Sequence, residues 1–204
     1  MPPTNPARRR ALADAAIELL AASGVHGVTH RAVEKAAGLP TGTASNYFRS
    51  REALLLAAAE RIVELHRADM DQAAEHHDAA GRTSLEQQLA DLIAGSLHGA
   101  ATRLRGRYLA IFELQLEAGR RPALAQALAG LQEVSLRFTA DHHAQLGLAV
   151  PATAVPTLVT LYGGALFTLV TMPPEHVSRD GAQAIAEAIV RGALDQSTPR
   201  NERR

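Results

Sequence analysis

Cysteine and tryptophan are both absent from this chain of 204 residues, and aromatic residues make up only 3% of it. Without cysteine the chain has no disulfide framework, no thiolate zinc site and no cysteine nucleophile. This composition suits a reducing compartment, and we expect the protein in the cytoplasm.

An excess of charge is missing too, because 21 Lys and Arg residues balance 21 Asp and Glu residues. This balance argues against a histone-like basic protein and against an acidic disordered tail. The hydrophobic fraction of 47% is ordinary for a globular protein with a substantial core. Asp14 and Glu18 interrupt the apolar segment Ala11–Leu20 behind the basic N-terminus, so we expect no signal peptide.

Catalytic signatures are also missing. The sequence contains no Gly-x-Ser-x-Gly, phosphate-binding loop, dinucleotide fingerprint, His-Glu-x-x-His or Glu-x-x-His motif. The pairs His76-His77 and His142-His143 are poor metal ligands, because adjacent residues of a helix point in different directions. We therefore expect no catalytic residue, no metal and no cofactor.

The neutral total conceals an uneven distribution of charge. Residues 1–51 carry seven basic and three acidic side chains, a net charge of +4, and residues 52–204 carry a net charge of −4. A basic N-terminal quarter favours contact with a polyanion through this part alone, while the acidic remainder is repelled by phosphate.

Nearly the whole chain is predicted to be helical, because Ala is abundant and apolar residues recur at spacings of three and four. Gly24 is placed to end the first helix in a left-handed conformation. Thr29, Ser50 and Thr83 are placed as N-caps of later helices, the last with Glu86 in a capping box. We expect about nine helices, among them residues 7–22, 29–37, 103–118, 122–146, 152–172 and 180–195.

The stretch from His142 to Pro174 contains no Asp, Glu, Lys or Arg, and its part Val155–Met172 approaches the length of a membrane span. Pro156, two glycines and four threonines lower the hydrophobicity of this part, and no basic cluster flanks it closely. We favour a core or interface helix and expect no membrane partner.

Residues 29–48 have the proportions of a helix-turn-helix motif. Gly38 permits the positive φ that such a turn needs, and Val33 and Ala37 can pack against the first helix. The second helix of the motif carries small polar side chains that can enter a major groove, namely Thr41, Thr43, Ser45 and Asn46.

The run from Gly38 to Leu54, GLPTGTASNYFRSREAL, resembles the DNA-binding domain of TetR-type transcriptional regulators. The similarity extends from Ala11 to Leu56, about a quarter of the chain. Its motif is a glycine turn, Gly-Thr at the start of the recognition helix, Tyr-Phe at its end, and a Ser-basic-Glu-x-Leu start to the next helix.

The resemblance implies an all-α fold with an N-terminal three-helix head and a C-terminal helical domain. It divides the chain into a helix-turn-helix DNA-binding domain (1–51) and a helical ligand-binding and dimerisation domain (52–196). The polar composition of residues 197–204 predicts a disordered tail.

The resemblance also assigns roles to individual residues. It implies base contacts by Arg31, Thr41, Gly42, Ser45 and Asn46. For Arg31 a bidentate contact with guanine is the natural chemistry. The resemblance implies phosphate contacts by Thr29, His30, Thr43, Tyr47 and Arg51.

Three residues of the motif depart from the family pattern. Glu34 stands where the family usually has alanine, and we expect its carboxylate to snorkel to solvent or to pair, for example with Lys35 or Arg31. Ala44 replaces a larger aliphatic residue, which leaves the packing to Phe48. Ser45 stands where an aromatic residue is frequent, so the operator sequence is not readable.

In the C-terminal region the resemblance implies a homodimer and a small-molecule effector. The expected dimer interface comprises Leu161, Gly163, Gly164, Ile185 and Ile189, although an intramolecular core explains the same apolar pattern. We favour the dimer because short recognition helices need symmetric half-sites.

The candidate effector-binding residues are Tyr108, Phe112, Gln115, Phe138, Tyr162 and Phe167, each of which could instead fill the core. Glu113 and Glu117 could bind a cationic ligand, but a solvated face beside Arg120 and Arg121 explains them better.

The function that the sequence favours is a ligand-responsive repressor that leaves a palindromic DNA operator when it binds a small molecule. The main alternative is a helical small-molecule carrier or enzyme with a vestigial DNA-binding head. A membrane-anchored helical protein is the third possibility.

Overall fold

The computed structural model describes residues 5–75, 84–129, 148 and 150–195. The described residues form helices and contain no strand, which confirms the all-α class. They divide into two compact units, one formed by Met1–Asp69 with Gly106–Gln132 and the other by Met70–Arg105 with Glu133–Arg204. The functional boundary expected at residue 51 stays a prediction.

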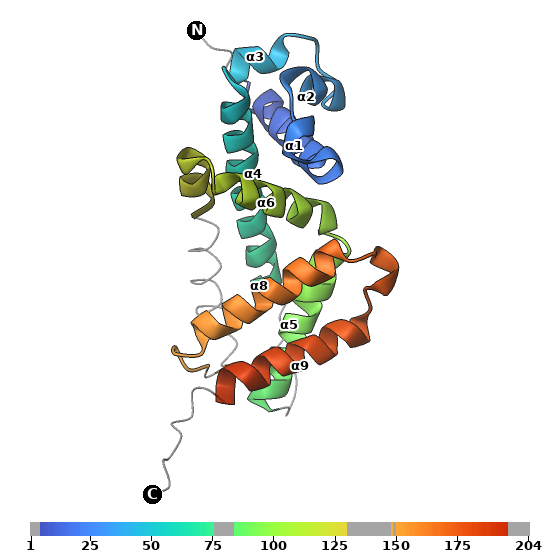
Figure 1. Cartoon of the computed structure of the whole chain (residues 1–204), viewed down its shortest axis with the longest axis vertical. Coiled ribbons are helices and arrows are strands. Elements are labelled where there is room, and N and C mark those ends of the chain that lie inside the picture. The colour runs from blue at the N-terminus through green and yellow to red at the C-terminus, as the bar shows by residue number, and fades with distance from the viewer. Residues whose placement is uncertain (1–4, 76–83, 130–147, 149, 196–204) are drawn as a thin grey trace, which may run out of the picture. The chain divides into compact units, whose positions relative to one another are not determined.

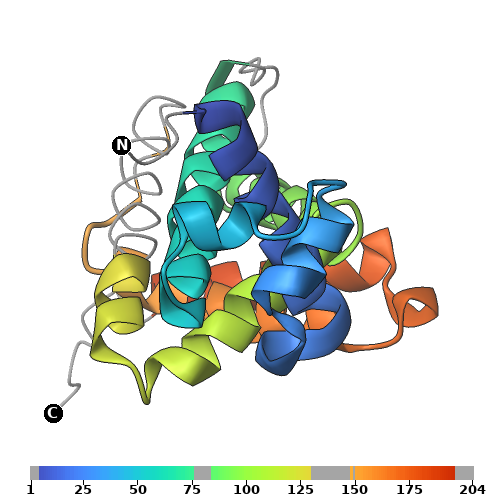
Figure 2. The same cartoon turned by 90° about the horizontal axis from the view of Figure 1, so that it is seen from above.

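The first unit contains the N-terminal helices together with most of α4 and α6 (Figures 1 and 2). Its elements are α1 (Pro6–Gly27), α2 (His30–Ala36), α3 (Thr43–Tyr47), α4 (Arg51–Glu75) and α6 (Arg105–Ala118). The core of this unit is built from side chains that are less than 2% exposed, among them Leu12, Leu20, Val33, Leu54, Ile62 and Leu114.

The helix α1 is longer than the sequence predicts, because one further turn follows the break at Gly24. Gly24 has φ +64° and ψ −173°, so the expected positive φ is confirmed, and the chain continues in helical turns to Gly27. Asn5 caps the start of α1 through its side-chain oxygen, which accepts from the backbone N–H groups of Ala7 and Arg8.

Two of the three expected N-caps are confirmed. The Thr29 hydroxyl accepts from the Ala32 N–H at 3.1 Å at the start of α2, and the Ser50 hydroxyl accepts from the Ala53 N–H at 3.1 Å at the start of α4. The third prediction was wrong by one residue, because Ser84 caps the next helix by accepting from the Gln87 N–H at 3.2 Å. Thr83 is followed three residues later by Glu86, and Ser84 by Gln87. The capping-box pattern therefore fits either hydroxyl.

The second unit contains α5 (Leu85–Ala101), α8 (Val155–Thr171), the short 3₁₀ helix η1 (Pro174–His176) and α9 (Arg179–Asp195). All three α-helices pack against one another, and α8 and α9 lie side by side across α5 (Figure 1). Pro173 and Pro174 end α8 and turn the chain back toward α9. No helix in the described residues combines the length and the apolar character needed to cross a bilayer.

Some predicted features lie outside the described residues, namely Phe138, both histidine pairs and the tail 197–204. Of the helix predicted over 122–146, residues 122–129 are described and are helical.

Candidate nucleic-acid interface

The helix-turn-helix motif is closed by two glycines with positive φ, Gly38 at +64° and Gly42 at +89°. The carbonyl of Glu34 accepts from the Leu39 N–H at 2.9 Å, which ends α2. The hydroxyl of Thr43 donates to the Pro40 carbonyl at 2.6 Å and so fixes the turn that precedes α3. These local bonds orient α3 relative to α2.

The five residues predicted to contact bases are all exposed to solvent in the described structure. One lies on α2 and the others lie in the turn before α3 or on α3 itself, and the set comprises Arg31, Thr41, Gly42, Ser45 and Asn46. Their exposure leaves them accessible to the edges of bases, and their role stays a prediction.

The residues predicted to contact phosphate are more varied in their surroundings. Thr29 is exposed, and His30 is half-buried with its Nε2 atom 2.8 Å from the Phe48 carbonyl oxygen. Thr43 is half-buried. Within the described part of the chain, the Tyr47 hydroxyl is buried and has no hydrogen-bond partner. The Tyr47 side chain would therefore have to adopt another χ1 rotamer to bring its hydroxyl to a phosphate.

Arg51, the remaining residue of this set, donates hydrogen bonds within the protein. Its Nε atom donates to the Val28 carbonyl at 2.9 Å, and its Nη2 atom donates to the Val25 carbonyl. Three further N–H groups of the guanidinium stay available in principle for a phosphate, because Arg carries five donors. Arg51 thus supports the end of α1 while its phosphate contact stays a prediction.

The expectation for Glu34 was wrong. Its side chain neither reaches solvent nor pairs with Lys35 or Arg31, because Glu34 is only 3% exposed and its Oε1 atom accepts from the Ala44 N–H at 2.7 Å. The physical reason is that the first turn of α3 presents an N–H group that needs an acceptor. The small Ala44 side chain adds little bulk beside that amide.

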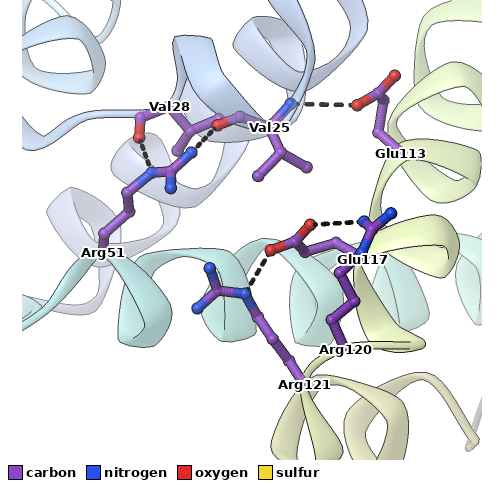
Figure 3. A network of polar contacts seen from close by, with 7 residues as sticks. All are labelled: Val25, Val28, Arg51, Glu113, Glu117, Arg120 and Arg121. Atoms are coloured by element: carbon purple, nitrogen blue, oxygen red, sulfur yellow. Dashed lines mark hydrogen bonds and ion pairs between the residues drawn. The ribbon is translucent and has the colours of Figure 1, made fainter.

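A clamp formed by α4 and α6 holds the segment Val25–Val28 at the end of α1 (Figure 3). Arg51 from α4 bonds the carbonyls of this segment, and the Glu113 Oε2 atom from α6 accepts from the Val25 N–H at 3.1 Å. Gly24 makes room for the carboxylate, since a Cβ atom there would lie 3.0 Å from Glu113 Oε2. The expectation of a solvated Glu113 is therefore corrected.

Glu117 lies one helical turn beyond Glu113 and pairs with the two arginines that lie near it in the sequence (Figure 3). Its carboxylate pairs with Arg121 at 2.5 Å and with Arg120 at 3.5 Å. The hydrogen bond from Arg121 holds the pKa of Glu117 below its ordinary range.

A second set of contacts joins α6 to the C-terminal half of α4. Arg107 forms an ion pair with Asp69, and the rings of His66 and Tyr108 meet edge to face at 6.5 Å between centroids. Burial, reinforced by the positive charge of Arg107, lowers the pKa of His66. Both effects favour the neutral imidazole in the folded protein.

The described residues proposed for the effector fall in both units. Tyr108 is buried, Phe112 half-buried and Gln115 exposed on α6 in the first unit. On α8 in the second unit, Tyr162 bonds the Ser96 hydroxyl at 2.7 Å, and Phe167 is 49% exposed.

The residues proposed for the dimer interface differ in their exposure to solvent. Leu161 is 40% exposed, and Gly163 and Gly164 are exposed with no atom within 4 Å of an added Cβ. Ile185 is half-buried, whereas Ile189 is buried within its own unit. The exposed members lie on α8, which carries no charged residue.

Sequence reasoning missed the acceptor role of Glu34, the clamp by Glu113 and Arg51, and the Asp69–Arg107 pair. The departure of Glu34 from the usual alanine was the one available signal. The partners of Glu113 and Asp69 lie 88 and 38 positions away in the sequence, so no local pattern could indicate them.

Two family models match the chain. Residues 12–58 match the model of bacterial regulatory proteins of the tetR family. Residues 84–196, more than half of the chain, match the model of the tetracyclin repressor-like C-terminal domain.

Among curated proteins, the chain is 34% identical over 89 residues to the HTH-type transcriptional regulator BetI of Escherichia coli (strain K12). The aligned segment covers 44% of this chain and 44% of BetI, so less than half of that relative is matched. The matches to regulators do not favour the alternative of a carrier or an enzyme.

Among solved structures, a TetR-family transcriptional regulator from Mesorhizobium loti has a TM-score of 0.74 at 17% identity, covering 95% of this chain and 98% of that one. A TetR family member from Streptomyces coelicolor A3 (SCO1917) has a TM-score of 0.60 at 27% identity, covering 89% and 97%. The multidrug binding protein EbrR, complexed with proflavin, has a TM-score of 0.59 at 26% identity, covering 89% and 99%.

The helix-turn-helix geometry, the helical second unit and both family models agree with one another. The chain belongs to the TetR family of bacterial transcriptional regulators.

Proposed function

We propose that the chain binds a two-fold symmetric DNA operator as a homodimer and leaves it when a small molecule binds, so that it acts as a repressor. The observation that carries the proposal is the exposure of all five predicted base-contacting residues on one helix-turn-helix motif. Because the target is chromosomal DNA, we expect the protein to act in the cytoplasm.

Base recognition is assigned to Arg31 and to the polar residues around α3. Arg31 can bond guanine through two N–H groups, and Asn46 can bond adenine in the same bidentate way. Thr41, Gly42 and Ser45 provide small surfaces that allow α3 to approach the floor of the major groove closely.

Backbone contacts are assigned to the residues that flank α2 and α3, namely Thr29, His30, Thr43, Tyr47 and Arg51. A phosphate oxygen would provide the Tyr47 hydroxyl with the partner that it lacks within the described part of the chain. Such contacts fix the register of the protein on the duplex without reading its sequence.

Dimerisation is assigned to the uncharged face of α8. Leu161 and Phe167 expose apolar surface there, and Gly163 and Gly164 would let a second helix approach closely. A homodimer would present two copies of α3 to half-sites about 34–36 Å apart, one turn of DNA. The remaining proposed interface residues, Ile185 and Ile189, lie on α9.

The effector response is assigned to α6 within the first unit. This helix carries Tyr108, Phe112 and Gln115, and the same helix bonds Val25 through Glu113. An effector that favours another position of α6 would therefore alter the support of the segment that leads into α2, and the two heads would lose the spacing that the operator requires. EbrR, which is a multidrug binding protein, supports a small-molecule effector for this chain as well.

A gel-shift assay tests the proposal. The purified full chain is titrated onto the promoter region of its own gene and onto an unrelated fragment of equal length, at moderate salt. We expect a shift of the promoter fragment at lower protein concentration. A carrier or enzyme with a vestigial head would leave both fragments unshifted, and equal shifts of the two would contradict sequence-specific recognition.

A further inference from the structure

Glu34 is the one charged side chain of the described residues that is buried, with 3% of its surface exposed. A buried carboxylate is costly unless hydrogen-bond donors compensate it. Its position on α2, beside the start of α3, therefore calls for a structural reason that outweighs this cost.

The helix α3 has only five residues, Thr43–Tyr47, and a helix of one turn is not stable on its own. Its N-cap residue is Gly42, which has no side chain and so offers no acceptor to the first turn. The Thr43 N–H is bonded to the Pro40 carbonyl at 3.1 Å, so the buried N–H of Ala44 is the one that needs an acceptor from another element.

Glu34 supplies this acceptor. Its Oε1 atom lies 2.7 Å from the N–H of Ala44, a residue that is 0% exposed and therefore has no access to solvent. The backbone carbonyl of Glu34 accepts from the Leu39 N–H at 2.9 Å. A single residue of α2 thus bonds both the turn and the start of α3.

The other end of α3 is also held from α2. The Nε2 atom of His30 lies 2.8 Å from the carbonyl oxygen of Phe48, which follows the last residue of the helix. Phe48 itself is 3% exposed and anchors this end in the core. Both ends of α3 are therefore fixed by side chains of α2.

We propose that Glu34 is a positioning residue for operator recognition, which holds the start of α3 so that Ser45 and Asn46 keep the geometry that base contacts require. This inference rests on the proposed function, in which α3 enters the major groove. Ser45 and Asn46 lie on α3 and move with it, whereas three of the five assigned phosphate contacts, Thr29, His30 and Arg51, come from outside α3. Loss of the Glu34 acceptor should therefore weaken specific binding more than non-specific binding.

Two substitutions of similar volume separate the acceptor from the bulk of the side chain. Glu34→Met fills the same space and removes the acceptor, whereas Glu34→Gln keeps an oxygen that can accept from the Ala44 N–H. Glu18→Gln is the matched control for charge, because Glu18 is an exposed carboxylate of the same head. Affinity is measured for the operator obtained by selection and for a scrambled duplex of equal length.

We expect Glu34→Met to lose about tenfold or more in affinity for the operator and less than about threefold for the scrambled duplex. Glu34→Gln should stay within about threefold of the wild type on both duplexes, and Glu18→Gln should behave like the wild type. An equal loss on both duplexes, or no loss on either, would overturn the positioning role. Should Glu34→Met fail to fold, Glu34→Asp makes the same comparison, because its carboxylate is withdrawn by one methylene group.

Amide hydrogen exchange at Ala44 provides a readout that needs no DNA. We expect Glu34→Met to accelerate exchange of the Ala44 N–H while exchange at Val33 stays as in the wild type. Unchanged exchange at Ala44 would show that Glu34 does not hold α3. If the wild type prefers no DNA sequence, the proposed function fails, and the exchange rates still decide whether Glu34 fixes α3.

Discussion

Gly24→Ala is predicted to destabilise the chain more than Gly38→Ala, although both glycines have φ +64°. A Cβ atom at position 38 would meet nothing within 4 Å, whereas one at position 24 would lie 3.0 Å from the Glu113 Oε2 atom. Gly38→Ala therefore measures backbone strain without a steric contact. Gly24, with ψ −173°, lies in a region essentially limited to glycine, so alanine is strained there as well. Gly24→Ala adds the displacement of the carboxylate that accepts from the Val25 N–H.

The size of the effect follows from these two terms. An alanine held in such a backbone conformation costs about 1–3 kcal/mol. Loss of a hydrogen bond to a charged acceptor costs about 1.5–3 kcal/mol, and we take the lower end because Glu113 is half-buried. The hydrogen-bond term alone should therefore make the two variants differ by about 1.5–2 kcal/mol, or about 3–8 °C in melting temperature for a chain of this length.

Thermal unfolding at one fixed protein concentration provides the assay, because the melting temperature of a dimer depends on concentration. Gly95→Ala is the control, since Gly95 is an exposed residue within α5 with free space around it, and this change should stabilise the chain slightly. Combining Gly24→Ala with Glu113→Ala should cost less than the sum of the single changes, because both remove the same hydrogen bond. Equal melting temperatures for Gly24→Ala and Gly38→Ala, or full additivity in the double variant, would refute the clamp.

Three further predictions concern the head and its support. Asn46→Ala should change the base preference of the protein at one operator position, at a cost of about 1–3 kcal/mol for the preferred base, and competition binding with operator variants checks this. Arg51→Met should lower the melting temperature, because two carbonyls lose their hydrogen-bond donor. It should also weaken binding to all DNA and reduce the salt dependence of that binding. Unchanged binding at every salt concentration would contradict the phosphate contact. Because the folded-state pKa of His66 is lowered from 6.5, the unfolded chain binds the proton more readily, and stability is lost as the pH falls below about 6.5. His66→Phe keeps a ring against Tyr108 and should reduce the fall in melting temperature between about pH 7.5 and pH 5.5, relative to the wild type.

The sequence was informative where local chemistry decides the structure. Gly24 and Gly38 were placed correctly at positive φ because the pattern around them ends a helix, and Thr29 and Ser50 were placed correctly as N-caps because a hydroxyl precedes each helix. Periodic apolar residues also sufficed for the all-α class.

The features that the sequence did not indicate depend on contacts between distant segments. Glu113 was expected on a solvated face, because nothing near it in the sequence indicates a contact with the Val25 N–H. Arg51 was assigned to a phosphate contact, and nothing near it in the sequence indicated that it bonds carbonyls at the end of α1. Such contacts arise only after α4 and α6 have packed against α1 within the first unit, so they follow from tertiary structure and not from local propensity.

The central claim is that the exposed face of the helix-turn-helix motif recognises a symmetric operator. Selection of bound duplexes from a random-sequence pool by the purified full chain tests this most directly. We predict enrichment of a palindrome whose half-sites are centred about 10 base pairs, or a multiple of that distance, apart. Recovery of duplexes without a common sequence, or of a single half-site without a symmetric partner, would contradict the account.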